Sequence, residues 1–131
     1  MRTERPLSKL LPALGLLAIL ALATGLAQAG DEQAATAALK KVETKKVCMV
    51  NDTVFERDQI PVTVEGRTYY GCCEMCKERL AKDAAIRSAV DPVSGKKVDK
   101  ATAFIVAKPD HSVLYFENEA SFERYAKQGK S

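Results

Sequence analysis

The stretch of sequence that decides the fold is Arg67-Thr68-Tyr69-Tyr70-Gly71-Cys72-Cys73-Glu74-Met75-Cys76-Lys77-Glu78-Arg79-Leu80. It holds three of the four cysteines of this 131-residue chain, at a point where a strand is expected to turn into a helix. The remaining cysteine, Cys48, lies upstream across a long spacer. One cysteine, a long spacer and a C-x3-C pair is a pattern that gathers thiolates around a single ion. The pattern therefore predicts a site for a thiophilic metal.

The chemistry of thiolates restricts which ions such a site can hold. Polarisable sulfur donors favour Cu(I) and Zn(II), which need three or four ligands converging from different parts of the backbone. We expect Cys72 at the end of a strand and Cys76 in the first turn of a helix, where the positive end of the helix dipole stabilises thiolates. Cys73 has three interpretations: a fourth ligand, a disulfide partner for Cys48, or a small buried residue.

The same residues resemble those of a known family. Cys48, the pair Tyr69-Tyr70, Cys72 and Cys76 are similar to the TRASH and YHS heavy-metal-binding domains, whose pattern is Cys, a comparable spacer and Tyr-Tyr-x-Cys-x-x-x-Cys. The resemblance implies a treble-clef-like hairpin and helix and a role in metal trafficking, buffering, resistance or sensing. It departs from the family at the first cysteine, because Val47-Cys48-Met49-Val50-Asn51 stands where the family usually has Asp-Pro-Val-Cys-Gly.

A second, altered copy of this pattern is indicated further along the chain. Asp91-Pro92-Val93-Ser94-Gly95 matches that family turn with serine in place of cysteine, and a shift of 45 residues pairs Glu117 with Cys72 and Ser121 with Cys76. We therefore expect a metal-binding unit at residues 47–90 and a degenerate second unit at 91–131 that packs on it. Chance similarity between two short segments is the alternative.

The hydrophobic patterning predicts an α+β fold made of two successive hairpin-plus-helix units. Alternation between apolar and polar residues predicts strands, and runs without Pro, Gly or β-branched residues predict helices. Asn118 is a favourable N-cap for the closing helix, and Glu78 with Lys82 forms an i,i+4 pair in the first. The expected strands are 60–64, 67–71, 101–107 and 112–116, and the expected helices are 73–90, with a possible break at Asp83, and 119–128.

The N-terminal region predicts export. Basic residues, an apolar run from Leu10 to Leu26 and Ala27-Gln28-Ala29 before Gly30 are typical of a cleaved signal peptide at residues 1–29, with an uncleaved anchor as the alternative. Residues 30–46 are expected to be a flexible linker. We therefore expect a periplasmic or secreted protein that has no membrane contact after cleavage. The formal net charge of +3 points to no particular partner. The sequence has no clustered basic face and no RNA- or DNA-binding signature, so we expect no nucleic-acid partner.

Competing functions follow from the same cysteines. An oxidising compartment and four cysteines also fit structural disulfides in an interaction module, and Cys73 with Cys76 has the C-x-x-C spacing of thiol-disulfide redox proteins. Met49 and Met75 incline the metal towards copper, although packing is the commoner role of methionine. His111, the single histidine, is expected in an exposed turn. No acid-base constellation is visible, so we expect metal binding and exchange with a donor or acceptor protein, without enzyme activity.

Overall fold

The computed structural model of this chain describes residues 38–129. The predicted signal peptide and the first part of the predicted linker lie outside the described residues. The strands are β1 (Lys40–Lys41), β2 (Val47–Cys48), β3 (Thr53–Val54), β4 (Ile60–Val64), β5 (Arg67–Gly71), β6 (Ser88–Val90), β7 (Lys97–Asp99), β8 (Phe104–Ala107) and β9 (Val113–Phe116). The helices are α2 (Glu74–Lys82) and α3 (Glu119–Lys127), with short 3-10 turns η1 (Thr44–Lys46) and η2 (Ala85–Arg87).

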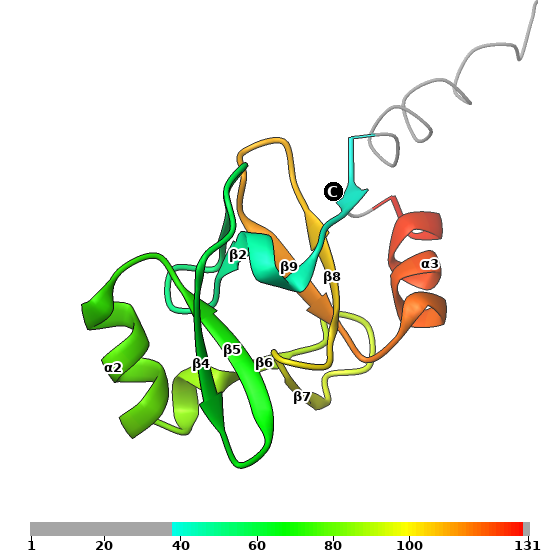
Figure 1. Cartoon of the computed structure of the whole chain (residues 1–131). Coiled ribbons are helices and arrows are strands. Elements are labelled where there is room, and N and C mark those ends of the chain that lie inside the picture. The colour runs from blue at the N-terminus through cyan, green and yellow to red at the C-terminus, as the bar shows by residue number, and fades with distance from the viewer. Residues whose placement is uncertain (1–37, 130–131) are drawn as a thin grey trace, which may run out of the picture.

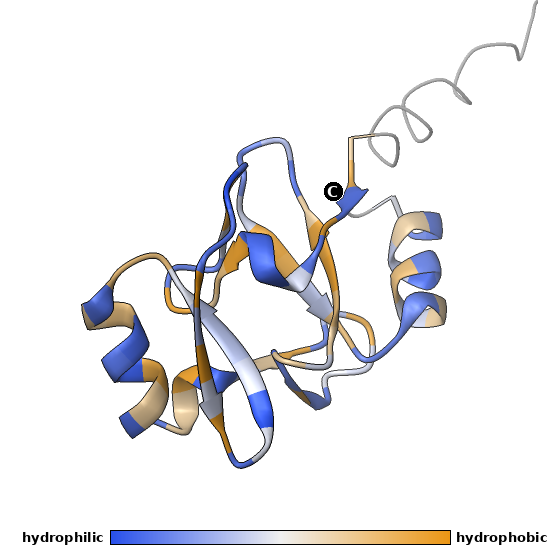
Figure 2. Cartoon of the chain, in the orientation of Figure 1, coloured by the Kyte–Doolittle hydropathy of each residue, from blue (hydrophilic) through white to orange (hydrophobic). Residues whose placement is uncertain are grey.

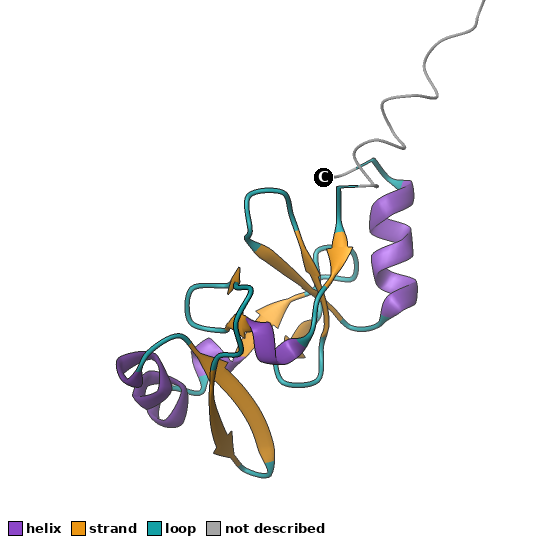
Figure 3. Ribbon diagram, turned by 45° about the horizontal axis from the view of Figure 1, so that its top comes forward, coloured by secondary structure: helices purple, strands orange, loops and turns teal. Residues whose placement is uncertain are grey.

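Two antiparallel hairpins, each followed by a helix, organise the described part of the chain and confirm the predicted α+β class. β4 pairs with β5 and leads into α2, and β8 pairs with β9 and leads into α3. α2 and α3 lie at opposite ends of the molecule, with the strands between them (Figure 1). The β4–β5 hairpin extends away from the rest of the strands (Figure 3). The metal-ligand candidates therefore belong to the end that carries α2.

The first hairpin follows directly from its turn residues. Glu65 and Gly66 both have positive φ, +51° and +76°, and connect Val64 to its partner Arg67. Two-residue loops with positive φ at both positions match the twist of the flanking strands. This turn sets the register that brings Gly71, at the end of β5, opposite Ile60.

The two helices correspond residue for residue under the predicted shift of 45. Each has nine residues, and each begins after a side chain that accepts a hydrogen bond from the amide three residues later. Cys73 Sγ accepts from Cys76 N at 3.4 Å, and Asn118 Oδ1 accepts from Ser121 N at 2.9 Å. Such N-caps satisfy an amide that has no partner inside the helix. The N-cap predicted at Asn118 is confirmed, and so is the closing helix.

The predicted length of the first helix is wrong. α2 ends at Lys82, close to the break expected at Asp83, and the residues that follow form η2 and then strand β6. The Asp83 carboxylate accepts from Ala85 N at 2.8 Å and turns the chain. β6 then pairs with β7, so backbone pairing overrides the helical propensity of this segment.

The segment predicted to be a linker folds onto the second hairpin where the structure describes it. β1 pairs with β8, aligning Lys40 with Ala107, and Leu39 is buried with Val106 and Phe116. The strands predicted at 101–107 and 112–116 begin later, at Phe104 and Val113. A turn occupies residues 101–103, and Ser112 forms only an isolated bridge with Thr53.

A shared hydrophobic core joins the two units. It combines residues of the first, including Met49, Tyr69 and Leu80, with residues of the second such as Ile105 and Tyr115. Figure 2 shows β2 and β8 as hydrophobic, whereas both helices alternate hydrophobic and hydrophilic positions. A smaller cluster of Leu39, Val106 and Phe116, with Phe122 and Tyr125, packs α3 against the sheet. Burying these faces against one core stabilises the arrangement of the two units.

Across residues 38–129, neither helix is long and apolar enough to cross a bilayer.

Candidate metal centre

Three cysteines that are distant in sequence converge at one point of the fold. The Sγ atoms of Cys48, Cys72 and Cys76 all lie within 4.8 Å of one another. Cys48 ends β2, Cys72 follows β5 directly, and Cys76 lies in the first turn of α2. The structure thus brings together Cys48, Cys72 and Cys76, and it places Cys72 and Cys76 in the elements that the sequence indicated.

Backbone hydrogen bonds hold the Cys48 loop against both units. Met49 N donates to Tyr70 O at 2.9 Å, which fastens the loop to β5 of the first unit. On the other side, Val113 N donates to Asp52 O at 2.9 Å. Asp52 adopts a left-handed φ of +52°, which reverses the chain between β2 and β3. The position of the Cys48 thiol is therefore set by contacts with both hairpins.

Gly71 permits the close approach of α2 to β5. A Cβ at this position would lie 2.9 Å from the Cβ of Cys76 and 3.0 Å from the backbone nitrogen of Lys77. The first distance is shorter than Cβ atoms tolerate and the second is unusually tight, so a side chain here would require the helix to move. The Gly71-Cys72 step consequently places Cys72 Sγ 3.6 Å from Cys76 Sγ.

The dimensions of this group fit a soft ion. Thiolates about 2.3 Å from one ion are separated by about 4 Å in a trigonal arrangement and about 3.8 Å in a tetrahedral one. The 3.6 Å between Cys72 and Cys76 and the 4.8 Å limit for the whole group bracket these values. The spacing of Cys48, Cys72 and Cys76 is therefore compatible with one soft metal ion held by all three sulfurs.

The proton affinities of the three thiols differ because their surroundings differ. Burial opposes ionisation of Cys48, but hydrogen bonds from the backbone N–H groups of Asn51 and Val50 outweigh it and lower the pKa of Cys48. Burial raises the pKa of Cys72 and raises that of Cys76 to about 12. A metal that binds all three sulfurs must therefore displace protons from Cys72 and Cys76 at neutral pH.

One polar side chain contacts a sulfur of the group directly. Asn51 Nδ2 donates to Cys72 Sγ across 3.7 Å, from the same loop that carries Cys48. A donor of this kind stabilises negative charge on a ligand and orients it. Asn51 was not among the residues predicted for the site, and its only signal in the sequence is its proximity to Cys48 along the chain.

Cys73 lies outside the group of three. It is exposed, whereas Cys48 and Cys76 are buried, and its Sγ is 3.3 Å from Cys76 Sγ. The Cys76 amide that donates to it lowers the pKa of Cys73. All four cysteines are free thiols in the structure. Of the three interpretations of Cys73, burial as a small core residue is wrong.

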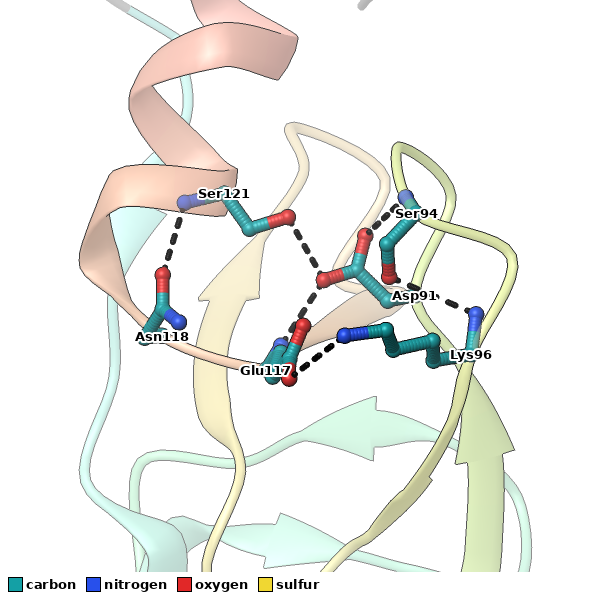
Figure 4. A network of polar contacts seen from close by, with 6 residues as sticks. All are labelled: Asp91, Ser94, Lys96, Glu117, Asn118 and Ser121. Carbon is teal, nitrogen blue, oxygen red and sulfur yellow. Dashed lines mark hydrogen bonds and ion pairs between the residues drawn. The ribbon is translucent and has the colours of Figure 1, made fainter.

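In the second unit, the residues that correspond to the metal-ligand candidates form hydrogen bonds to a buried carboxylate. Asp91 is fully buried, and its Oδ2 accepts from Glu117 N at 2.8 Å and from Ser121 Oγ at 2.6 Å. Its Oδ1 accepts from Val93 N at 2.7 Å and from Ser94 N at 3.1 Å; Figure 4 shows the contacts of Asp91 with Ser94, Glu117 and Ser121. A buried carboxylate with four donors thus connects the turn at 91–95 to the start of α3.

The other residues that the sequence singled out take mostly the expected positions. Tyr69 is buried in the core and Tyr70 is half-buried. Met49 packs in the core, whereas Met75 is 73% exposed. His111 lies exposed in the turn between β8 and β9, as expected, with a φ of +67°.

Comparison of the chain with protein-family models, with curated proteins and with solved structures gave no match.

Proposed function

We propose that this protein binds one soft metal ion, Cu(I) in preference to Zn(II), through Cys48, Cys72 and Cys76, and hands it on outside the cytoplasm. The observation that carries the proposal is the convergence of three thiols within 4.8 Å from three separate elements. The resemblance to heavy-metal-binding domains and the predicted signal peptide support the same conclusion. The role is binding and transfer, without a catalytic step.

The number of ligands favours copper. Structural zinc sites have four protein ligands, whereas three thiolates complete a trigonal Cu(I) site. In the part of the chain that the structure describes, no fourth Cys, His, Asp or Glu joins the group of three. Burial of Cys48 and Cys76 also limits access of water as an additional ligand.

Metal content is the direct test. The protein is purified from the export compartment without a metal-affinity tag, and its metal and free thiols are counted. We expect about one equivalent of copper, lost in the variants Cys48→Ser, Cys72→Ser and Cys76→Ser, because two remaining thiolates hold the ion more weakly. Cys73→Ser is the matched control and should keep its metal. A wild-type protein that takes up neither Cu(I) nor Zn(II) after reduction would exclude the proposal.

One distance favours a second candidate function, thiol-disulfide exchange. Cys73 Sγ and Cys76 Sγ are 3.3 Å apart at the start of α2, and a C-x-x-C pair at a helix N-terminus is the arrangement of redox proteins. A variant at Cys48 distinguishes the two functions. Cys48→Ser should abolish metal binding, but it should leave reversible oxidation of the Cys73–Cys76 pair unchanged if that pair is the functional one.

A further inference from the structure

Access to the metal-ligand candidates is unequal. Cys48 is completely buried, together with Val47 and Met49 on either side of it. Cys76 is 7% exposed. A partner that delivers or removes a metal therefore cannot reach Cys48 directly. By contrast, Cys73 is exposed and lies at the surface end of the same group of thiols.

The four sulfurs form a sequence of short steps from the surface to the interior. Cys73 Sγ is 3.3 Å from Cys76 Sγ, which is 3.6 Å from Cys72 Sγ, and both of these lie within 4.8 Å of Cys48. Separations of about 4 Å are those between sulfurs bound to one ion. A metal can therefore gain one sulfur before it loses another, without ever being released to water.

We propose that Cys73 is the exchange ligand through which the metal enters and leaves the buried site. This inference rests on the proposed function. On release, the Cys73 sulfur bonds to the ion beside Cys76, and the bond from the ion to Cys48 breaks. Cys73 gives up its thiol proton, Cys48 takes one up, and the oxidation state of the metal does not change. The ion is then held by Cys72, Cys73 and Cys76, a single surface segment.

The acceptor that suits this segment is a thiolate donor, either on another protein or on a small molecule. Its sulfur bonds to the exposed ion and replaces Cys73 first, so that each bond broken follows one formed. Met75, two residues after Cys73 in the first turn of α2, leaves its thioether side chain 73% exposed. The position of Cys73 at the N-cap holds it close to Cys76 throughout, because its sulfur accepts the Cys76 amide hydrogen bond.

The test separates the rate of transfer from affinity. Cys73→Ser keeps an N-cap oxygen, so α2 should still form. Asn118→Ser, at the corresponding N-cap of α3, is the matched control. Each protein is loaded with Cu(I) in anaerobic buffer containing a reductant, which prevents disulfides. Cu(I) affinity is measured by competition with bicinchoninate, and the rate of transfer is measured after mixing with excess glutathione.

We expect the Cu(I) dissociation constant of Cys73→Ser to stay within about threefold of the wild-type value. The variant should transfer Cu(I) at least about fivefold more slowly, because the change affects exchange kinetics and not binding energy. Asn118→Ser should match the wild-type protein in both measurements. A smaller slowing would overturn the exchange role. A large loss of affinity would overturn it as well, because Cys73 would then be a resident ligand. Absence of Cu(I) binding by the wild-type protein would instead refute the proposed function itself.

Discussion

Lys100 Nζ donates to the main-chain carbonyl of Met49, the residue after Cys48, across 2.7 Å. Lys100 belongs to the turn between β7 and β8 of the second unit and is only 4% exposed. Its Nζ also lies 2.5 Å from Asp52 Oδ1, which accepts from the Tyr115 hydroxyl at 2.9 Å. A buried lysine of the second unit thus holds the loop that carries a metal-ligand candidate of the first.

Replacing this lysine should affect both folding and metal binding. In Lys100→Met the buried Met49 carbonyl loses its donor, which should lower the free energy of unfolding by about 2 kcal/mol. Because the Cys48 loop loses its anchor, Cu(I) affinity should fall by about tenfold, as is common when residues that orient metal ligands are removed. Lys97→Met, at an exposed site on β7, is the control for both measurements. Unchanged Cu(I) affinity in Lys100→Met would show that Cys48 is positioned without this contact.

Gly71 should be required for the spacing between Cys72 and Cys76. Gly71→Ala introduces a Cβ 2.9 Å from that of Cys76, so α2 must shift, at a cost of about 1–3 kcal/mol in stability. The shift should weaken Cu(I) binding by at least about tenfold, since ligands need placement to within about 0.5 Å. Denaturant unfolding and chelator competition measure the two effects.

Gly66→Ala distinguishes a local clash from general destabilisation. Gly66 has a φ of +76° but open space around its Cβ position, so alanine there should cost about 1 kcal/mol in backbone strain and leave Cu(I) affinity unchanged. If both glycine variants lost metal equally, the close contact between Gly71 and Cys76 would not be the cause.

Asp91 should make stability depend on acidic pH. Although burial opposes its ionisation, hydrogen bonds from Glu117 N and Ser121 Oγ outweigh burial and lower the pKa of Asp91. The unfolded state therefore binds the proton more readily, with a pKa of about 3.9. The stabilisation by Asp91 is complete above that value and is lost as the pH falls through the lower pKa of the folded state.

Asp91→Asn measures this contribution. In this variant the side-chain amide nitrogen, itself a donor, would face one of the donors from which a carboxylate oxygen now accepts. We therefore expect the free energy of unfolding to fall by about 2 kcal/mol at pH 7. The difference in unfolding free energy between wild type and variant should shrink as the pH falls from 5 to about 2. Should the difference stay constant over this range, the carboxylate charge would not be what stabilises the junction at α3.

Metal affinity should increase with pH. The raised pKa of Cys72 and the pKa of about 12 at Cys76 mean that both thiols hold protons at neutral pH. Because Cu(I) displaces these protons, each one should strengthen the apparent affinity by up to about tenfold per pH unit. Competition titrations between pH 6 and 8 give the slope, and proton release into weak buffer gives the number displaced. A flat profile would mean that the bound ion leaves Cys72 and Cys76 protonated.

Local signals predicted much of the fold because neighbouring residues carry them. The two-residue gap between the strands predicted at 60–64 and 67–71, the N-cap at Asn118 and the i,i+4 pair of Glu78 and Lys82, observed at 3.5 Å, depend only on residues a few positions apart. The cysteine spacing likewise predicted Cys48, Cys72 and Cys76 as a group. Such features are encoded by short-range sterics and hydrogen bonding, which are nearly independent of the rest of the molecule.

Other features depend on contacts between distant segments. The strand at Lys40–Lys41 exists because β8 offers it backbone partners, and the chain after Lys82 forms β6 because β7 pairs with it. Nothing in the sequence around Lys100 indicated a buried lysine, and spacing alone left the position of Cys73 open. Burial and long-range hydrogen bonding determine these features, because the energy of a residue depends on which groups surround it in the folded chain.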